Sequence, residues 1–193
     1  MSTREESSPW NTPADAHRRA AAAFGERVDG TRDWDAPAPV EGWTARDVVG
    51  HLVKWLPGFL AGGGVDLPPG PSVAGDPVAA WHHHVGAVQD LLESPRAGDE
   101  FVHPHAGTRV LGEVIDSFYV SDVFMHTWDL ARATGQDDTL DPARCEELLA
   151  AMTPIEDLMR SSGQYGPAVP VASDAPVQDR LIAFIGRDPH WTP

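Results

Sequence analysis

One stretch, LGEVIDSFYVSDVFMHTWDLARATG over residues 111–135, constrains the fold more than any other part of the chain. On a helix of 3.6 residues per turn, it has one apolar face, made of Leu111, Ile115 and Phe118. The same face continues into three polar residues, Asp122, His126 and Asp129. If a long helix buries this face, its carboxylates and imidazole must find partners in the rest of the protein or in a bound ion.

A divalent cation would partner two of these buried groups at once. Asp122 and His126 are four residues apart, so their side chains project from adjacent turns and can reach one ion. A third ligand is needed, and His51 is the best candidate because it lies among large apolar residues on the inner face of another predicted helix. The spacing leaves one alternative open, a buried Asp–His hydrogen bond without a metal.

Capping signals mark the starts of the other helices. A capping residue precedes a first-turn proline or forms a capping box at four places: Thr12–Pro13, Thr44 with Asp47, Asp76–Pro77 and Asp141–Pro142. Together with apolar periodicity, these signals predict helices over about residues 12–28, 44–60, 76–94, 111–135, 141–160 and 177–185. Gly135 is expected to end the long helix in a left-handed conformation. The pattern predicts an all-α four-helix bundle with additional C-terminal helices.

Two segments between the predicted helices lack helical periodicity. The glycine- and proline-rich residues 62–75 predict a long crossover loop, and residues 95–108 are expected to contain a short extended piece at 100–103. In the helix predicted over 141–160, Ile155 and Leu158 are expected to pack inward. Length suits one domain over residues 1–193, with residues 1–11 as a flexible lead-in.

The charge balance excludes some classes of partner. The 14 basic and 29 acidic residues give a formal net charge of −15, which repels nucleic acid and anionic membrane surfaces. Cys145 is the single cysteine, so no internal disulfide can form and a reducing compartment is expected. No long apolar run or signal-peptide core is present, so we expect a soluble, cytoplasmic protein.

The other histidines are weaker candidates for ligands. His82, His83 and His84 are consecutive on a predicted helix, where neighbours diverge by about 100°, so a solvated face is expected. His103 and His105 flank a proline in a loop and could contact a ligand or nothing. Cys145 is expected to pack in the interior and not to act as a nucleophile.

Three blocks carry a resemblance: EGWTARDVVGHLVKW, SDVFMHTWDLARATGQD and GPAVPVASDAPVQDRLIAFIGRDP. In this order they resemble the actinobacterial metal-binding proteins related to the N-terminal domain of mycothiol-dependent maleylpyruvate isomerase, within the DinB/YfiT-like superfamily. The resemblance implies a four-helix bundle with up-down-down-up order and a long crossover. It also implies a divalent metal between a histidine of the second helix and an acidic-x-x-x-His pair, which here are His51, Asp122 and His126.

The resemblance constrains the metal and the substrate. Where family members commonly have Glu or His, this chain has Asp122, whose shorter arm would draw the metal nearer the helix. Two imidazoles and a carboxylate suit Zn²⁺, with Ni²⁺, Fe²⁺ and Mn²⁺ also admissible. The isomerase has a further C-terminal domain that contributes to its active site, whereas this chain ends at Pro193 after one short helix. Maleylpyruvate is therefore not assigned as the substrate.

Three protein ligands leave an open coordination position, which is typical of catalytic zinc. The ion could activate a water or favour the thiolate form of a small thiol, and the resemblance favours mycothiol. The leading hypothesis is a metal-dependent thiol transferase or isomerase that acts on a small electrophile. The alternatives are a metal-dependent hydrolase and a non-enzymatic bundle that is stapled by its metal or sequesters an electrophile.

Other residues are predicted to support the site. Asp129 and Arg132 are candidates for orienting a metal ligand or contacting the substrate, and the alternative for these residues is an ion pair or a cap near the helix end. Trp55 and Trp128 are expected to wall the pocket. A homodimer is possible, although no exposed apolar stripe demands one.

Overall fold

In the computed structural model, which describes residues 12–193, the predicted caps are present at the helix starts. The side chains of Thr12, Asp76 and Asp141 accept hydrogen bonds from backbone N–H groups of the first turn. Thr44 and Asp47 form the reciprocal capping box. These contacts satisfy donors that a helix start leaves free. The predicted lead-in, residues 1–11, lies outside the described residues.

The helix bounds lie close to those predicted. The four long helices of the bundle are α1 (Pro13–Gly30), α2 (Ala45–Gly62), α3 (Pro77–Glu93) and α5 (Ser121–Thr134). The shorter elements are η1 (Pro95–Gly98), β1 (Glu100–His103), β2 (Gly107–Val110), α4 (Leu111–Val114), η2 (Ile115–Val120), α6 (Pro142–Met152), η3 (Thr153–Ile155), α7 (Glu156–Ser161) and α8 (Val177–Phe184). Gly135 ends α5 with φ of 66°, as predicted.

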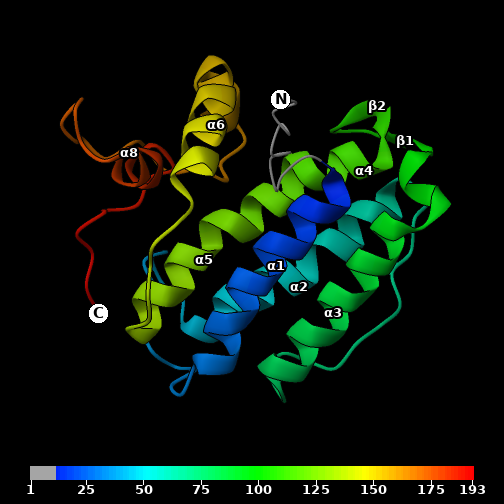
Figure 1. The fold of residues 1–193 in the computed structure, drawn as a ribbon, viewed down its shortest axis with the longest axis horizontal. Helices are drawn as coiled ribbons and strands as arrows, with labels where there is room; N and C mark the ends of the chain where they lie inside the picture. The colour runs from blue at the N-terminus through cyan, green and yellow to red at the C-terminus, as the bar shows by residue number, and fades with distance from the viewer. Residues whose placement is uncertain (1–11) are drawn as a thin grey trace, which may run out of the picture.

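The long helices have the up-down-down-up order. Figure 1 shows α2 and α3 running in one direction and α1 and α5 in the other, with a long loop crossing between α2 and α3. Helix α1 packs against α3 and α5, and α2 packs against the same two helices. The predicted all-α bundle of DinB-like type, with its crossover, is therefore confirmed.

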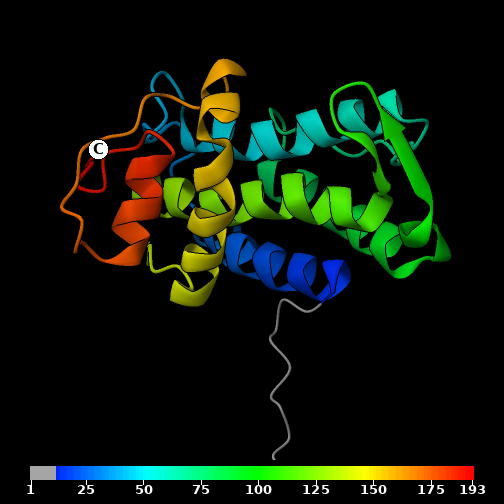
Figure 2. The same ribbon diagram turned by 90° about the horizontal axis from the view of Figure 1, so that it is seen from above.

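Helix α5 contributes to two hydrophobic cores. One face packs in the bundle interior, where Phe24, Trp81 and Tyr119 are fully buried. The other carries Phe124, Met125 and Trp128 into a second core with α6 and α8, which belong to residues 140–193, here called the C-terminal unit. Figure 2 shows α6 and α8 beside α5, at one end of the bundle. Since both faces of α5 are covered, its polar residues are held between the bundle and the C-terminal unit.

The predicted long helix is not uniform. Residues of η2 are π-helical, with more residues per turn than the α-helices on either side, and they shift the face that α5 presents. Tyr119 is fully buried, whereas Phe118 is 42% exposed. The prediction that Phe118 lies on the inner face is wrong because it assumed 3.6 residues per turn throughout.

The helix predicted over residues 141–160 is also interrupted. Pro154 lies in the 3₁₀ turn η3, which separates α6 from α7 and changes the direction of the following side chains. Ile155 is 48% exposed and Leu158 is 69% exposed, while Met159 is buried. The prediction that Ile155 and Leu158 pack inward is therefore wrong.

A β-hairpin covers one end of the bundle. The predicted extended piece is strand β1, and β2 pairs with it antiparallel, from Glu100 opposite Val110 to His103 opposite Gly107. Phe101 is 1% exposed and its ring lies 5.8 Å from that of Phe59. The second strand was not expected from the sequence.

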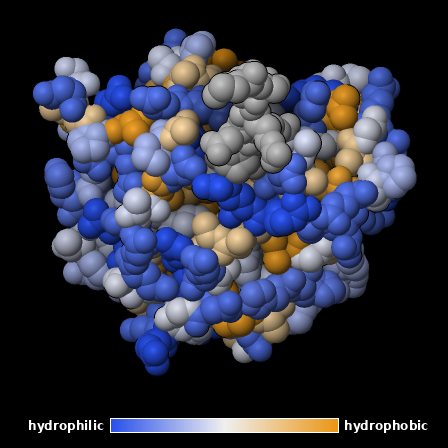
Figure 3. Space-filling model, viewed as in Figure 1, coloured by the Kyte–Doolittle hydropathy of each residue, from blue (hydrophilic) through white to orange (hydrophobic). Residues whose placement is uncertain are grey.

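The surface shown in Figure 3 is mostly hydrophilic, with scattered hydrophobic residues and no continuous apolar patch on that face. This agrees with the acidic composition of the chain. Within residues 12–193, no helix combines the length and apolar character needed to cross a membrane.

Candidate metal site

The bundle brings the three predicted ligands together. Helix α2 carries His51, and the packed helix α5 carries Asp122 and His126. One ligand atom from each residue lies within 4.8 Å of the others. Asp122 Oδ2 is 2.9 Å from His51 Nε2, and Asp122 Oδ1 is 3.4 Å from His126 Nε2. The carboxylate therefore lies between the two imidazoles, an arrangement that could hold one divalent ion.

The carboxyl group of Asp122 is held in its charged form. Burial acts to raise its pKa, but nearby His126 and hydrogen bonds from His51 and Trp55 lower the pKa below the usual 3.8. The indole Nε1 of Trp55 donates to Asp122 Oδ2 over 3.0 Å. Asp122 is thus an anion at neutral pH, as a metal ligand must be.

Two tryptophans border the imidazoles. The ring of Trp43 stacks on His126 at 5.8 Å and lies 5.1 Å from His51. Trp43 immediately precedes the N-cap of α2, where an apolar residue ordinarily serves as a hydrophobic staple, so no sequence signal marked it as a site residue. Trp55 lies 6.2 Å from His51 and also contacts Asp122, so it does more than form a wall. Trp128 instead lies in the second core, and its prediction as a pocket wall is wrong.

Asp129 fixes the orientation of His126. Its Oδ2 lies 2.7 Å from His126 Nδ1. Burial raises the pKa of Asp129, but Arg187 and His126 outweigh burial, so the pKa lies below 3.8 and the group accepts the hydrogen bond as a carboxylate. Nδ1 of His126 is then the donor, and Nε2 faces Asp122. A carboxylate behind a histidine in this way is the usual support for a metal-binding imidazole.

The arginine that pairs with Asp129 is not Arg132, the other candidate for a supporting role. Arg132 pairs with Asp138, donates to the carbonyl of Pro189 and stacks over Trp128. The cation that faces Asp129 is Arg187, which lies 58 residues away in the C-terminal unit, with its Nη2 3.2 Å from Oδ2. Arg187 belongs to the third block of resemblance, which gave no role to this residue.

Tyr165 is a further residue near the site that sequence analysis did not identify. It follows α7 and packs on the second core, which contains Phe124 and Met125 of the metal-site helix. Burial, and to a lesser extent the charge of Asp122, raises the pKa of Tyr165 to about 12. Its hydroxyl is therefore a hydrogen-bond donor at neutral pH.

The site opens to solvent on the α2 side. The side chain of His51 is 32% exposed and that of Asp122 is 17% exposed, whereas His126 is only 5% exposed. A small molecule could therefore approach from the side of His51. His126, by contrast, is held from behind by Asp129.

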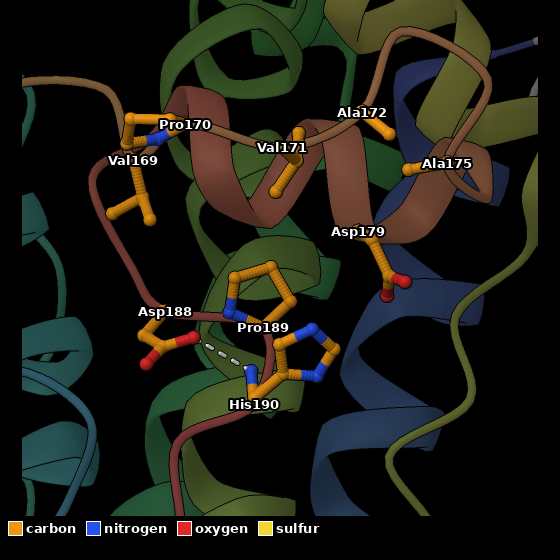
Figure 4. Close-up of a pocket in the computed structure, with 9 residues that line it drawn as sticks. All are labelled: Val169, Pro170, Val171, Ala172, Ala175, Asp179, Asp188, Pro189 and His190. Atoms are coloured by element: carbon orange, nitrogen blue, oxygen red, sulfur yellow. Dashed lines mark hydrogen bonds between the residues drawn. The ribbon is translucent and has the colours of Figure 1, made fainter.

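A separate hollow lies in the C-terminal unit. Its volume is about 320 Å³, and it is lined by residues 169–172 together with Ala175, Asp179, Asp188, Pro189 and His190. Figure 4 shows the side chain of Asp188 accepting a hydrogen bond from the backbone N–H of His190, at 2.8 Å. None of the three candidate metal ligands lines this hollow.

The remaining histidines do not join the metal-site cluster. His82 is exposed and lies 2.8 Å from Asp29, and His83 is also exposed. His84 is only 5% exposed, so the predicted solvated face is wrong for this residue, which points into the bundle. His103 is buried at the end of β1, with its ring 4.2 Å from that of Phe59.

The fold and site define a class, a DinB-like helical bundle with a His–Asp–His group suited to a divalent ion. The chain belongs to the family of the mycothiol maleylpyruvate isomerase N-terminal domain, whose model matches residues 14–131. Two proteins of Mycobacterium tuberculosis described as uncharacterized, one each from strains CDC 1551 / Oshkosh and ATCC 25618 / H37Rv, are similar to it. Each is 31% identical over 181 residues, which cover 91% of this chain and 97% of the relative. No solved structure matches significantly.

Proposed function

We propose that the protein binds one divalent metal, Zn²⁺ in the first instance, through His51, Asp122 and His126. We further propose that it is a thiol transferase or isomerase that uses a small thiol of the mycothiol type against an electrophilic substrate. The observation that carries the proposal is the convergence of three ligand atoms within 4.8 Å, one of them on a histidine held by a buried carboxylate.

The donor set supports zinc. Two imidazole nitrogens and one carboxylate oxygen are common ligands of catalytic zinc, and three protein ligands leave a position for a substrate. When bound, the ion would supply a positive charge that favours the thiolate form of a thiol at neutral pH. Asp129 would keep the imidazole of His126 in the required tautomer, and Trp55 would hold the carboxylate of Asp122 in place.

The thiol is proposed on two grounds. The family takes its description from a mycothiol-dependent isomerase. The partly exposed His51, whose ring lies near the indoles of Trp43 and Trp55, gives a small polar molecule access from solvent. We place this activity in the bacterial cytoplasm, where small thiols are kept reduced, and the single buried Cys145 suits such a compartment.

Metal analysis and a thiol assay on the same preparations test the proposal. Untagged wild type should contain about one equivalent of zinc and consume mycothiol in the presence of a panel of small electrophiles. His126→Ala should lose both properties while its circular dichroism stays helical. His83→Ala is the matched control, because His83 is exposed on α3, and it should keep both properties.

The result also separates the alternatives. A wild type that binds no metal after reconstitution with several divalent ions would refute the metal site. Bound metal with thiol-independent turnover of an ester or amide would favour a hydrolase. Bound metal without turnover of any substrate, combined with a large loss of stability on chelation, would favour the non-enzymatic bundle.

A further inference from the structure

Arg187 lies in the GRDP sequence after α8, a motif of the third block of resemblance to which the proposed function gives no role. Its guanidinium faces both carboxylate oxygens of Asp129, with Nη2 3.2 Å from Oδ2 and Nε 3.4 Å from Oδ1. The side chain of Arg187 is 13% exposed and that of Asp129 is 1% exposed. This is the bidentate geometry in which an arginine both orients a carboxylate and compensates its charge.

The backbone holds Arg187 in place from the other side. Its Nη1 donates to the carbonyl of Ile185 over 3.0 Å. Gly186 has φ of +87°, and a Cβ built there would lie 3.1 Å from the backbone of Gly166. Only glycine suits this position, because the backbone has a left-handed φ there and also lies close to the backbone of Gly166. The turn therefore sets the direction in which Arg187 leaves α8.

Asp129 connects Arg187 to the candidate metal site. The same Oδ2 that lies 3.2 Å from Arg187 lies 2.7 Å from Nδ1 of His126. If Arg187 were absent, Asp129 would be a buried carboxylate with one imidazole partner and would be free to rotate. The orientation of His126 would then no longer be fixed.

We propose that Arg187 is a positioning residue of the metal centre, through which the C-terminal unit fixes Asp129 and thereby the imidazole of His126. This inference rests on the metal site of the proposed function and does not depend on the thiol chemistry. Arg187 acts through Asp129 and does not itself face the three ligand atoms. Residues outside the matched region 14–131 thus complete the site.

A double-mutant cycle with Asp129→Asn and Arg187→Met tests the proposal, with zinc affinity measured by competition against a chromophoric chelator. Arg187→Met should bind zinc roughly tenfold more weakly. The double variant should bind no more weakly than Asp129→Asn alone, because Arg187 acts through Asp129. The sign is diagnostic, since loss of a nearby positive charge alone would tighten the binding of a cation.

Thermal unfolding in a chelator gives a second readout that needs no metal. Arg187→Met should lower Tm by roughly 10 °C, because it leaves Asp129 buried without its cation. The double variant should recover part of this loss. Arg187→Lys keeps the charge without the bidentate geometry and should fall between wild type and Arg187→Met in zinc affinity, which provides a folded variant if the Met variant unfolds.

Arg27→Met is the matched control. The side chain of Arg27 is 11% exposed, close to the 13% of Arg187, and it donates to the carbonyl of Asp137, but it contacts neither Asp129 nor the turn at Gly186. Its loss should leave zinc affinity unchanged. Unchanged or tighter zinc binding in Arg187→Met, or additive effects in the cycle, would overturn the proposal while the metal site stands. A wild type without zinc affinity would refute both, and zinc binding without thiol turnover would refute only the proposed activity.

Discussion

Two pairs of histidines lie inside this bundle, and their surroundings differ. His17 of α1 and His84 of α3 lie around the ring of Tyr119, with centroid distances of 6.1 and 5.6 Å. His51 and His126 lie around Trp43 at 5.1 and 5.8 Å. In each pair, imidazoles from two helices flank one aromatic ring. The difference is in the charged groups beside them.

His17 and His84, here called the core pair, have no carboxylate partner within residues 12–193. Nδ1 of His17 lies 2.6 Å from the amide oxygen of Gln89, and burial lowers the pKa of His17 and of His84 to about 4. His51 and His126, here called the metal-site pair, have Asp122 between their imidazoles, and Asp129 lies behind His126. A histidine on an apolar helix face is thus a neutral core residue in one place and a candidate ligand in the other. The carboxylates make the difference.

Lowering the pH should reduce the stability of the fold through the core pair, and this is the largest effect that we expect. The unfolded imidazole has a pKa of about 6.5, and the folded values lie near 4, so the unfolded chain binds more protons between these values. Stability is complete above about pH 6.5 and falls as the pH drops to 4. At about 1.4 kcal/mol per pKa unit, each histidine contributes about 3 kcal/mol.

Urea unfolding in a chelator at pH 7, 5.5 and 4.5 measures this loss. The variant His17→Gln/His84→Gln should have a flatter pH profile over the same range, since it lacks the groups that take up protons. An equally steep profile in that variant would assign the acid sensitivity to other groups. The carboxylates Asp122 and Asp129 have lowered pKa values, so their stabilising contribution is lost mainly as the pH falls below 3.8, outside this window.

Zinc should sharpen the contrast between the pairs. At a free concentration 100 times Kd, a ligand that binds only the folded state raises its stability by about 2.7 kcal/mol. Wild type and His84→Ala should both gain this amount, measured as the shift of the urea midpoint. Asp122→Ala should gain nothing. An equal gain in Asp122→Ala would mean that zinc binds elsewhere.

Trp55→Phe tests how the metal-site carboxylate is held. The substitution keeps the aromatic ring and removes the Nε1 donor that lies 3.0 Å from Asp122 Oδ2. Loss of such a supporting hydrogen bond should weaken zinc binding by roughly tenfold, as followed by chelator competition. Phe59→Leu is a suitable control, because Phe59 contacts the ring of Trp55 but not Asp122. Equal losses in the two variants would indicate packing and not the hydrogen bond.

The parts of the structure that depend on neighbouring residues could be predicted from the sequence. Helix starts follow from caps such as Thr44 with Asp47, and the pairing of Asp122 with His126 follows from their spacing on one helix. The π-helical turn before α5 has no comparable local signal, so Phe118 was assigned to the wrong face. Pro154 did give a local signal, and the prediction of one unbroken helix did not use it.

The parts that depend on distant residues could not be predicted. Arg187 meets Asp129 only because the C-terminal unit folds back on α5, and nothing near Asp129 in the sequence distinguishes Arg187 from Arg132. Trp43 has the pattern of an ordinary helix staple. The burial of His84 depends on which of three consecutive histidines faces the core, and this choice follows from how α3 packs on α1 and α2.

Tyr119→Phe should have the smallest effect and the most informative sign. Tyr119 lies between the pairs, with its ring near His17, His84 and Trp55. Its hydroxyl has no hydrogen-bond partner within the described part of the chain, and the same holds for Nε2 of His17 and of His84. Removing a buried hydroxyl that has no partner should stabilise the protein by about 1 kcal/mol and leave zinc affinity unchanged.

A loss of stability in Tyr119→Phe would instead indicate that the buried hydroxyl has a hydrogen-bond partner in the core. If Tyr119→Phe loses about 1 kcal/mol in urea unfolding at pH 7, the hydroxyl has a partner in solution, and a buried water between it and the imidazoles is the simplest candidate. His17→Gln/His84→Gln/Tyr119→Phe would then lose less than the sum of the His17→Gln/His84→Gln and Tyr119→Phe effects, because one water serves all three groups. In that case the core pair would also have a polar partner, and the two pairs would differ only in the charge of that partner.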